Sequence, residues 1–245
     1  MKKKDNMCGR SSLTVTEKQL EIRFGSSFYS EDLERYNPIP YFNIAPTHVL
    51  PCLTMEDPSY FSPRRWGLIP SGSKTPAIGS KLINARVETI LEKSIFKQCI
   101  PHRRCLIPLD GYYEWMKQGS QRIPYRITRP EGDIFAVAGL FDQWKDPSGH
   151  IINSFTIITQ PASPSISHIH DRMPAILDRN EEKLWLEKNL NAHDLLALIR
   201  PAADDQIHFY RVGDQVNYVR NNDPSLILPV MDNNTPETNQ LSLFD

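Results

Sequence analysis

The chain has 245 residues, 40% of them hydrophobic, with 20 prolines, 11 glycines and four cysteines. This hydrophobic share argues against a disordered chain, and the length fits one large or two small domains. The sequence contains no run of about 18 apolar residues to span a membrane. The basic start MKKKDN precedes no apolar segment of a secretory signal. The cysteines form no C-x-x-C pair, which indicates neither a zinc ribbon nor a disulfide scaffold and favours a reducing cytoplasm.

The formal charge is −1, from 28 Lys and Arg against 29 Asp and Glu, which by itself argues against a nucleic-acid partner. The charge is unevenly distributed, however. Residues 1–110 carry 16 basic and 11 acidic side chains, a balance of +5, and residues 231–245 carry three acids and no base. Because local rather than net charge steers a phosphate backbone, a nucleic-acid partner stays open.

Hydrophobic patterns and turn residues predict a β-rich α+β domain without internal repeats. In chain order we expect a helix over 16–24, a helix over 85–96, strands over 104–107, 125–128, 134–140 and 155–159, and helices over 181–189 and 193–200. Thr14 or Thr16 would cap the first helix, and Pro201 stops the last. The domain ends near residue 230. We expect residues 231–245 to form a flexible tail because residues 232–240 are polar and lack apolar periodicity.

Cys8 lies in the segment MCGR, directly after Met7. Within a continuous chain it is a buried small side chain or an inert thiol. If translation begins at Met7 and that residue is removed, Cys8 gains a free α-amine of pKa about 7.7–8.0 beside a thiol of pKa about 8.5. Amine and thiol can then add to one aldehyde, first as an imine and then as a five-membered thiazolidine. The chemistry of Cys8 therefore depends on processing.

Several other residues have both a structural and a chemical interpretation. Asn84 caps a helix or holds a sugar or phosphate oxygen, and Arg86 is solvated or pairs with a phosphate. Glu114, in GYYEW, is a surface carboxylate or a proton-transfer group whose pKa is raised by aromatic neighbours. Trp66, which follows two arginines in SPRRWGLIP, stacks on a base of a single strand or belongs to the core.

The segment SHIHDRMP contains two histidines, His168 and His170, that would face one side of a strand. They could ligate a metal together, but no third ligand lies at a suitable spacing, so we expect no metal and no cofactor. His170 acts as a general acid or base near Arg172, or is a structural residue bonded to Asp171.

Taken together and in order, these segments resemble the SOS-response-associated peptidase family, the abasic-site processing proteins. The matching segments are MCGR at 7–10, NIAPT at 43–47, RRWGLIP at 64–70, NAR-ET at 84–89, RCLIPLDGYYEW at 104–115, AGLFDQW at 138–144 and IHDRMPAIL at 169–177. The resemblance implies a single mixed α+β domain over residues 7–230, with a β-barrel-like, mainly antiparallel core and flanking helices.

The resemblance also implies a reaction. The family removes its initiator Met by self-processing, and the freed cysteine joins the ring-opened aldehyde of an abasic site in single-stranded DNA as a shielding thiazolidine. On this pattern Cys8 is the nucleophile, Asn84 positions the amine or the sugar, Glu114 transfers protons and His170 protonates the sugar oxygen. The expected DNA contacts are Arg10, Trp66, Arg86 and Arg172. Slow strand cleavage by lyase chemistry is a secondary expectation, because an imine acidifies the neighbouring C–H bond.

Six residues, MKKKDN, precede Met7 and depart from the family pattern. Ordinary removal of Met1 would expose Lys2 and leave Cys8 in peptide linkage. We therefore expect the true start at Met7, with residues 1–6 a doubtful extension. Self-cleavage after Met7 in the longer chain and an inactive chain are the alternatives.

The C-terminal residues 240–244 read QLSLF. They resemble the short motif that docks bacterial DNA polymerases and repair proteins into the β sliding clamp. In that mode Leu241, Leu243 and Phe244 fill a hydrophobic pocket while Gln240 bonds its rim; alternatively, the tail packs back on its own domain. We expect a cytoplasmic monomer, associated with the nucleoid or replication forks, whose partner is single-stranded DNA containing abasic sites.

Two other classes of function stay open. One is a cysteine or N-terminal-nucleophile peptidase that acts on other proteins through Cys8, His170 and Glu114. The other is a non-enzymatic single-strand-binding or clamp-adaptor module. Its binding would weaken with salt but would not depend on the lesion or on Cys8.

Overall fold

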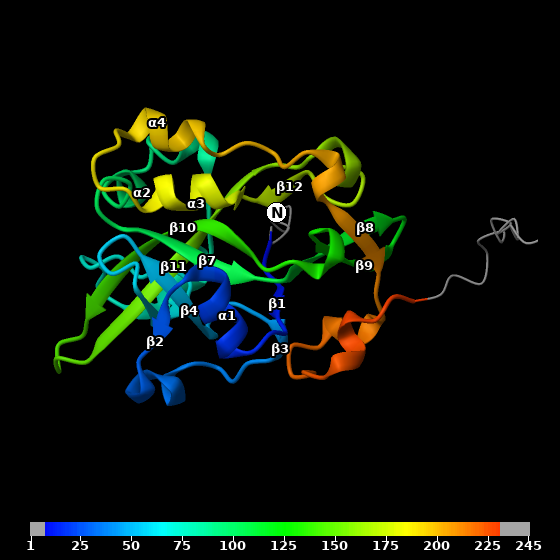
Figure 1. Cartoon of the computed structure of the whole chain (residues 1–245), viewed down its shortest axis with the longest axis horizontal. Coiled ribbons are helices and arrows are strands. Elements are labelled where there is room, and N and C mark those ends of the chain that lie inside the picture. Colours follow the sequence, from blue (N-terminus) through cyan, green and yellow to red (C-terminus); the bar gives the residue numbers. More distant parts are fainter. Residues whose placement is uncertain (1–7, 231–245) are drawn as a thin grey trace, which may run out of the picture.

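A five-stranded β-barrel forms the centre of the molecule in the computed structural model, which describes residues 8–230 (Figure 1). Its strands are β4 (Val49–Thr54), β5 (Tyr60–Trp66), β7 (Arg104–Leu109), β10 (Phe135–Lys145) and β11 (Ile151–Pro161). The neighbours β11–β10, β10–β7, β7–β4 and β4–β5 pair antiparallel. A parallel pairing of β5 with β11 closes the ring. The barrel-like, mainly antiparallel core is therefore confirmed.

Four short strands extend the barrel at its edges: β2 (Ser27–Phe28) beside β5, β6 (Asn84–Arg86) and β12 (Arg172–Pro174) beside β11, and β13 (Ile176–Leu177) beside β10. Two of these strands bear on the candidate site. β6 runs parallel to β11 and β12 runs antiparallel to it, so residues 84–86 and 172–174 both border β11.

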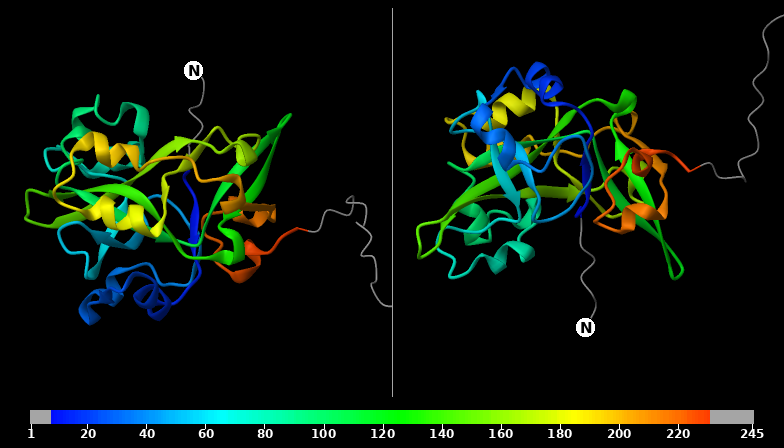
Figure 2. Two further views of the ribbon diagram at one scale, coloured as in Figure 1. Left: turned by 45° about the horizontal axis from the view of Figure 1, so that its top comes forward. Right: turned by 90° about the horizontal axis from the view of Figure 1, so that it is seen from below.

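A second, antiparallel sheet has the order β14–β9–β8–β1–β3. Its strands are β1 (Ser11–Leu13), β3 (Tyr41–Ile44), β8 (Gly111–Gln118), β9 (Gln121–Thr128) and β14 (His208–Arg211). β8 follows β7 after a single residue, so the two sheets are directly joined there. The last described segment, orange to red in Figures 1 and 2, packs beside the β8–β9 hairpin, away from the β10–β11 hairpin.

Four α-helices flank the sheets within residues 8–230: α1 (Glu17–Phe24), α2 (Ser94–Lys97), α3 (Arg179–Leu186) and α4 (Ala192–Ala197). Thr16 caps α1 through a capping box with Gln19, and Gly25 ends the helix at a φ of 66°. The α3 residue Trp185 is fully buried and its indole N–H donates to the carbonyl of Cys105 on β7. This contact attaches α3 to the barrel wall. None of the helices in the described part is long and apolar enough to cross a membrane.

Most of the expected elements are present, but one is wrong. Three predicted strands lie within β7, β9 and β11, and the fourth, 134–140, begins one residue before β10. The predicted helices at 16–24, 181–189 and 193–200 correspond to α1, α3 and α4. The helix predicted over 85–96 is instead a strand, a 3₁₀ turn and the four-residue α2. Pairing of β6 with β11 takes up the backbone bonds of residues 84–86, so tertiary structure overrides local helical propensity. Residues 1–7 and 231–245, including the QLSLF motif, lie outside the described residues.

Candidate active site

Glu114 is a buried carboxylate near the middle of β8. Its side chain is enclosed and the residue is only 3% exposed. Burial raises the pKa of the Glu114 carboxyl, although His170 and the hydrogen bond from Cys8 act in the opposite direction. The pKa raised by desolvation, expected from the GYYEW segment, is therefore confirmed, and the surface alternative is wrong.

Cys8 lies directly against this carboxylate. Its backbone N–H donates to Glu114 Oε1 over 2.7 Å, and the residue is 2% exposed. Burial, followed by the negative charge of Glu114, raises the pKa of the Cys8 thiol well above its ordinary value. The thiol is thus held in its protonated form and needs a nearby base before it can attack.

The backbone at Cys8 is unusual as well, with a φ of 39°. A residue with a Cβ adopts this left-handed region at a cost of about 1–2 kcal/mol. The strained residue is thus the same one whose backbone nitrogen bonds the buried carboxylate of Glu114.

His170 approaches Glu114 from the segment that precedes β12. Its Nε2 lies 4.0 Å from Glu114 Oε2, and its Nδ1 accepts a hydrogen bond from the amide of Arg172 over 3.0 Å. His168 lies in a turn rather than on a strand, with its ring 5.5 Å from that of Phe209, and it borders the same surface hollow as His170. The expectation that both histidines face one side of a strand is therefore wrong. Among the residues that the structure describes, no group of three or more His, Cys, Asp and Glu could hold a metal.

Asn84 completes the cluster from β6. Its side-chain amide donates to the carbonyl of Cys8 over 3.4 Å. The alternative in which Asn84 caps a helix is wrong, because the residue lies in a strand. The structure thus brings together Cys8, Asn84, Glu114 and His170, which come from four separate segments of the chain. Such a cluster pairs a strained thiol and its amide nitrogen with a carboxylate and an imidazole that can move protons.

Trp66 is not available to stack on a base. It is 1% exposed, its indole N–H donates to the carbonyl of Ile83 over 2.9 Å, and its ring stacks with that of Phe155. The DNA contact expected of Trp66 is therefore wrong. The residue is part of the barrel core, which was the other interpretation of the sequence.

The guanidinium of Arg172 is bonded to other residues of the protein. Its guanidinium forms a two-pronged ion pair with Glu88, and it also donates to the Thr159 carbonyl over 2.7 Å. The hydrogen bonds from Arg172 hold the pKa of Glu88 below its usual range. A phosphate contact by Arg172 does not fit this arrangement, because the charge is already paired. Arg172 instead fixes the segment that carries His170.

Arg10 and Arg86 lie at the edges of the cluster. Arg10 donates to Asn43 Oδ1 over 2.7 Å and to the Val216 carbonyl, and its guanidinium lies 5.7 Å from the Trp115 ring centre. Arg86 is exposed at the end of β6. Both positions border the site, so the expected phosphate contacts of these two arginines stay predictions.

Two hollows lie on either side of Trp115. One, of about 340 Å³, is lined by Glu114 and His170, and the other, of about 410 Å³, by Arg10 and Val219. Trp115 and Arg122 line both. From the sequence, Trp115 was considered only as an aromatic neighbour of Glu114. Because Trp115 follows a candidate catalytic residue directly, the sequence could also have indicated that its ring faces a ligand.

Asn43 was missed as well, although it lies in the NIAPT segment. It is fully buried, and its side-chain amide donates to the carbonyls of Val216, Tyr218 and Asn221 while its oxygen accepts from Arg10. One asparagine thereby ties the chain just after Cys8 to the last segment of the fold. No local pattern marks such a long-range contact.

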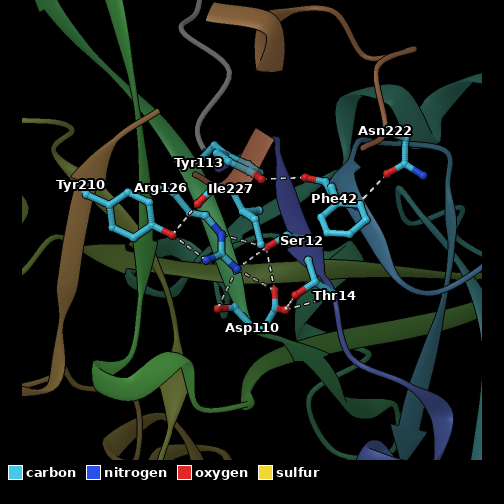
Figure 3. A network of polar contacts seen from close by, with 9 residues as sticks. All are labelled: Ser12, Thr14, Phe42, Asp110, Tyr113, Arg126, Tyr210, Asn222 and Ile227. Atoms are coloured by element: carbon cyan, nitrogen blue, oxygen red, sulfur yellow. Dashed lines mark hydrogen bonds and ion pairs between the residues drawn. The ribbon is translucent and has the colours of Figure 1, made fainter. Parts of the chain in front are cut away.

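A buried network sets the position of β1 between β8 and β3 of the second sheet (Figure 3). Asp110 accepts hydrogen bonds from Ser12 Oγ and from the Thr14 amide, both over 2.7 Å, and pairs with Arg126 over 3.1 Å. Arg126 packs so closely on Gly111 that a Cβ there would lie 2.7 Å from its Nε. Because β1 begins three residues after Cys8, this network holds the strand that leads into the site.

The geometry agrees with comparisons to known proteins. A family model described as SOS response associated peptidase (SRAP) matches residues 7–219. The chain belongs to the SRAP family. This confirms the resemblance inferred from the sequence segments.

Individual relatives in the SRAP family cover most of the chain. The abasic site processing protein YoqW of Bacillus subtilis (strain 168) is 37% identical over 224 residues, which span 90% of this chain and 99% of that protein. The abasic site processing protein HMCES of Xenopus tropicalis is 37% identical over 191 residues, 68% of this chain and 56% of that protein. A solved structure of a Bacteroides thetaiotaomicron protein, 26% identical, matches with a TM-score of 0.83 over 91% of this chain and 100% of that one.

Proposed function

We propose that this protein processes abasic sites in single-stranded DNA by linking Cys8 covalently to the lesion. Two observations support the proposal: relatives at 37% identity are abasic site processing proteins, and the Cys8 nitrogen lies 2.7 Å from a buried carboxylate. The second observation carries it, because an amine beside a proton-transfer group is what capture of an aldehyde requires.

The reaction needs a free α-amine on Cys8, so the active form begins at Cys8. Met7 is removed by self-processing. Glu114 takes the proton from the Cys8 thiol, the sulfur attacks the carbonyl carbon of Met7, and the Met7–Cys8 amide bond breaks as its nitrogen accepts that proton. Water then hydrolyses the thioester, which releases the preceding segment as a carboxylate and restores the Cys8 thiol. The contact between the Cys8 nitrogen and Glu114 Oε1 leaves the new amine beside the same carboxylate. The raised pKa of Glu114 makes its carboxylate a better proton acceptor than that of an ordinary glutamate, which suits a group that both accepts and returns protons.

Capture of the lesion then proceeds in two additions. An abasic sugar is largely a closed hemiacetal. As the ring opens to the aldehyde, His170 donates a proton to the ring oxygen and the anomeric hydroxyl gives its own proton to water. The Cys8 amine adds to the aldehyde carbon and water leaves, which gives an imine. The thiol then adds across the C=N bond, its proton moving through Glu114 to nitrogen, and closes the thiazolidine. One water is released overall.

Strand cleavage is a slower side reaction of the same intermediate. The imine acidifies the adjacent C–H bond, and removal of that proton expels the phosphate on the 3′ side by β-elimination. Closure of the thiazolidine removes the imine and so protects the strand. Lyase activity is therefore secondary.

The DNA strand runs across the two hollows beside Trp115, with the abasic sugar above Glu114. Trp115 offers the aromatic surface that Trp66 does not, and stacking on single-stranded bases requires no particular sequence. Arg10 and Arg86 hold phosphates on either side.

The test is a gel assay with a single-stranded oligonucleotide that carries one abasic site. Protein that begins at Cys8 should form a heat-stable adduct, and Cys8→Ala should form none. Cys99→Ala, which removes a different buried thiol, is the matched control and should react normally. General proteolysis without an adduct would favour the peptidase function, and salt-sensitive binding indifferent to the lesion would favour a binding module; either result contradicts the proposal.

We propose separately that the C-terminal residues 240–244 bring the protein to replication forks. The residues QLSLF, which lie outside the described residues, would dock in the hydrophobic pocket of a bacterial β sliding clamp and bring the enzyme to replication forks. A peptide of residues 231–245 should bind purified clamp in a titration, and Phe244→Ala should abolish binding. The proposal is contradicted if both peptides bind the clamp equally well, or if neither binds.

A further inference from the structure

His170 has two partners at Nδ1 that cannot act at the same time. The Arg172 amide donates to Nδ1 over 3.0 Å, and Asp171 Oδ1 lies 3.2 Å from the same nitrogen. An N–H donor needs a lone pair on Nδ1, so the amide contact belongs to a neutral ring with its proton on Nε2. A carboxylate contact needs a proton on Nδ1. The protonation of the ring therefore decides which partner it bonds.

The two partners differ in how firmly their surroundings hold them. The Arg172 amide is fixed, because Arg172 begins β12 and its guanidinium is bound to Glu88 and Thr159. The Asp171 side chain is 87% exposed, whereas the His170 ring is 16% exposed. Asp171 is thus a solvent-exposed carboxylate beside Nδ1 of a ring whose Nε2 faces Glu114.

We propose, on the basis of the proposed function, that Asp171 is a positioning residue that stabilises the proton-donating state of His170. In the imidazolium, Nδ1–H bonds Asp171 and Nε2–H points into the site. When Nε2 gives its proton to the sugar oxygen, the neutral ring keeps its proton on Nδ1. The Arg172 amide cannot bond that nitrogen, and Asp171 does. A proton from solvent then restores Nε2, so one solvent proton reaches the sugar oxygen in each cycle.

Other charged groups near the ring do not change when Asp171 is replaced. They are Glu114 and Lys117 on β8, Arg122 on β9, and His168 and Arg172 on the segment of His170 itself. A change observed on replacing Asp171 therefore reports its own contact with Nδ1.

The direct test is an NMR titration of the His170 ring in the whole chain, assigned by the signal lost in His170→Gln. Asp171→Asn should lower the titration midpoint by about 0.2–0.7 pH units, the range typical of an exposed ion pair. Asp171→Glu should restore it, and the exposed Asp133→Asn should leave it unchanged. A midpoint that moves by less than about 0.1 unit in Asp171→Asn overturns the inference.

The reaction gives a second readout. In single-turnover adduct formation, Asp171→Asn should shift the pH profile by the same amount and slow the reaction about two- to fivefold above the midpoint. If the parent chain forms no adduct, the proposed function fails while the NMR titration still tests Asp171. If the parent forms an adduct and the profile of Asp171→Asn does not move, the inference about Asp171 fails alone.

Discussion

Asp110→Ala should destabilise the protein strongly, because it leaves the buried guanidinium of Arg126 without its counter-ion. Asp110 and Arg126 have side chains that are 4% and 8% exposed. Asp110 also accepts from Ser12 and from the amide and hydroxyl of Thr14 (Figure 3). Breaking a buried pair on one side costs about 3–5 kcal/mol. That is a large part of the 5–15 kcal/mol, roughly, by which domains are stable.

Urea unfolding followed by tryptophan fluorescence measures the loss. The double variant Asp110→Ala/Arg126→Met should be at least about 2 kcal/mol more stable than Asp110→Ala, because it removes the buried positive charge that has lost its counter-ion. Asp32→Ala breaks the exposed pair with Arg35 and should cost less than about 1 kcal/mol. A loss under about 1 kcal/mol for Asp110→Ala, or a double variant no more stable than the single one, would refute the reasoning.

Three further predictions concern the site. Glu114→Gln should slow adduct formation by about 10²–10⁴-fold. Because burial raises the pKa of Glu114, its contribution to stability is present below its unfolded-state pKa and lost as pH rises through the folded pKa. The unprocessed Gln variant should therefore resist urea better than the parent at pH 8 but not at acid pH; the reverse order contradicts this. Trp66→Ala should lower the unfolding free energy by about 3–5 kcal/mol, whereas Trp115→Ala should mainly weaken single-strand binding in an anisotropy titration. In uncleaved chains, Cys8→Gly should be about 1 kcal/mol more stable than Cys8→Ala, because glycine adopts the φ of 39° freely; equal stability would show that no strain is held there.

Local patterns predicted the parts of the fold that depend on local chemistry. The strand pattern of 134–140 and the capping of α1 by Thr16 depend on neighbouring residues, and both are present. Closure of the barrel depends on the parallel pairing of Phe155 with Trp66, which no local pattern contains. For the same reason, the helix predicted over 85–96 began at residues that instead pair with β11.

The candidate site was identified by the order of its segments rather than by spacing. Cys8 and Glu114 are 106 residues apart and touch only because β1 pairs with β8. Trp66 was assigned to DNA because arginines precede it, but alternation along β5 turns both Arg64 and Trp66 inward. The guanidinium of Arg64 lies 4.1 Å from the Phe141 ring centre inside the protein, not along a DNA strand.

The φ of Cys8 is a torsion about its N–Cα bond, defined by the carbonyl carbon of the residue before it. Once the bond between residues 7 and 8 is cut, that carbon is gone and the torsion no longer exists. On the proposed route, the strain therefore belongs to the precursor alone and is absent from the processed enzyme. Relief of this strain would contribute about 1–2 kcal/mol to the driving force for cleavage on that route.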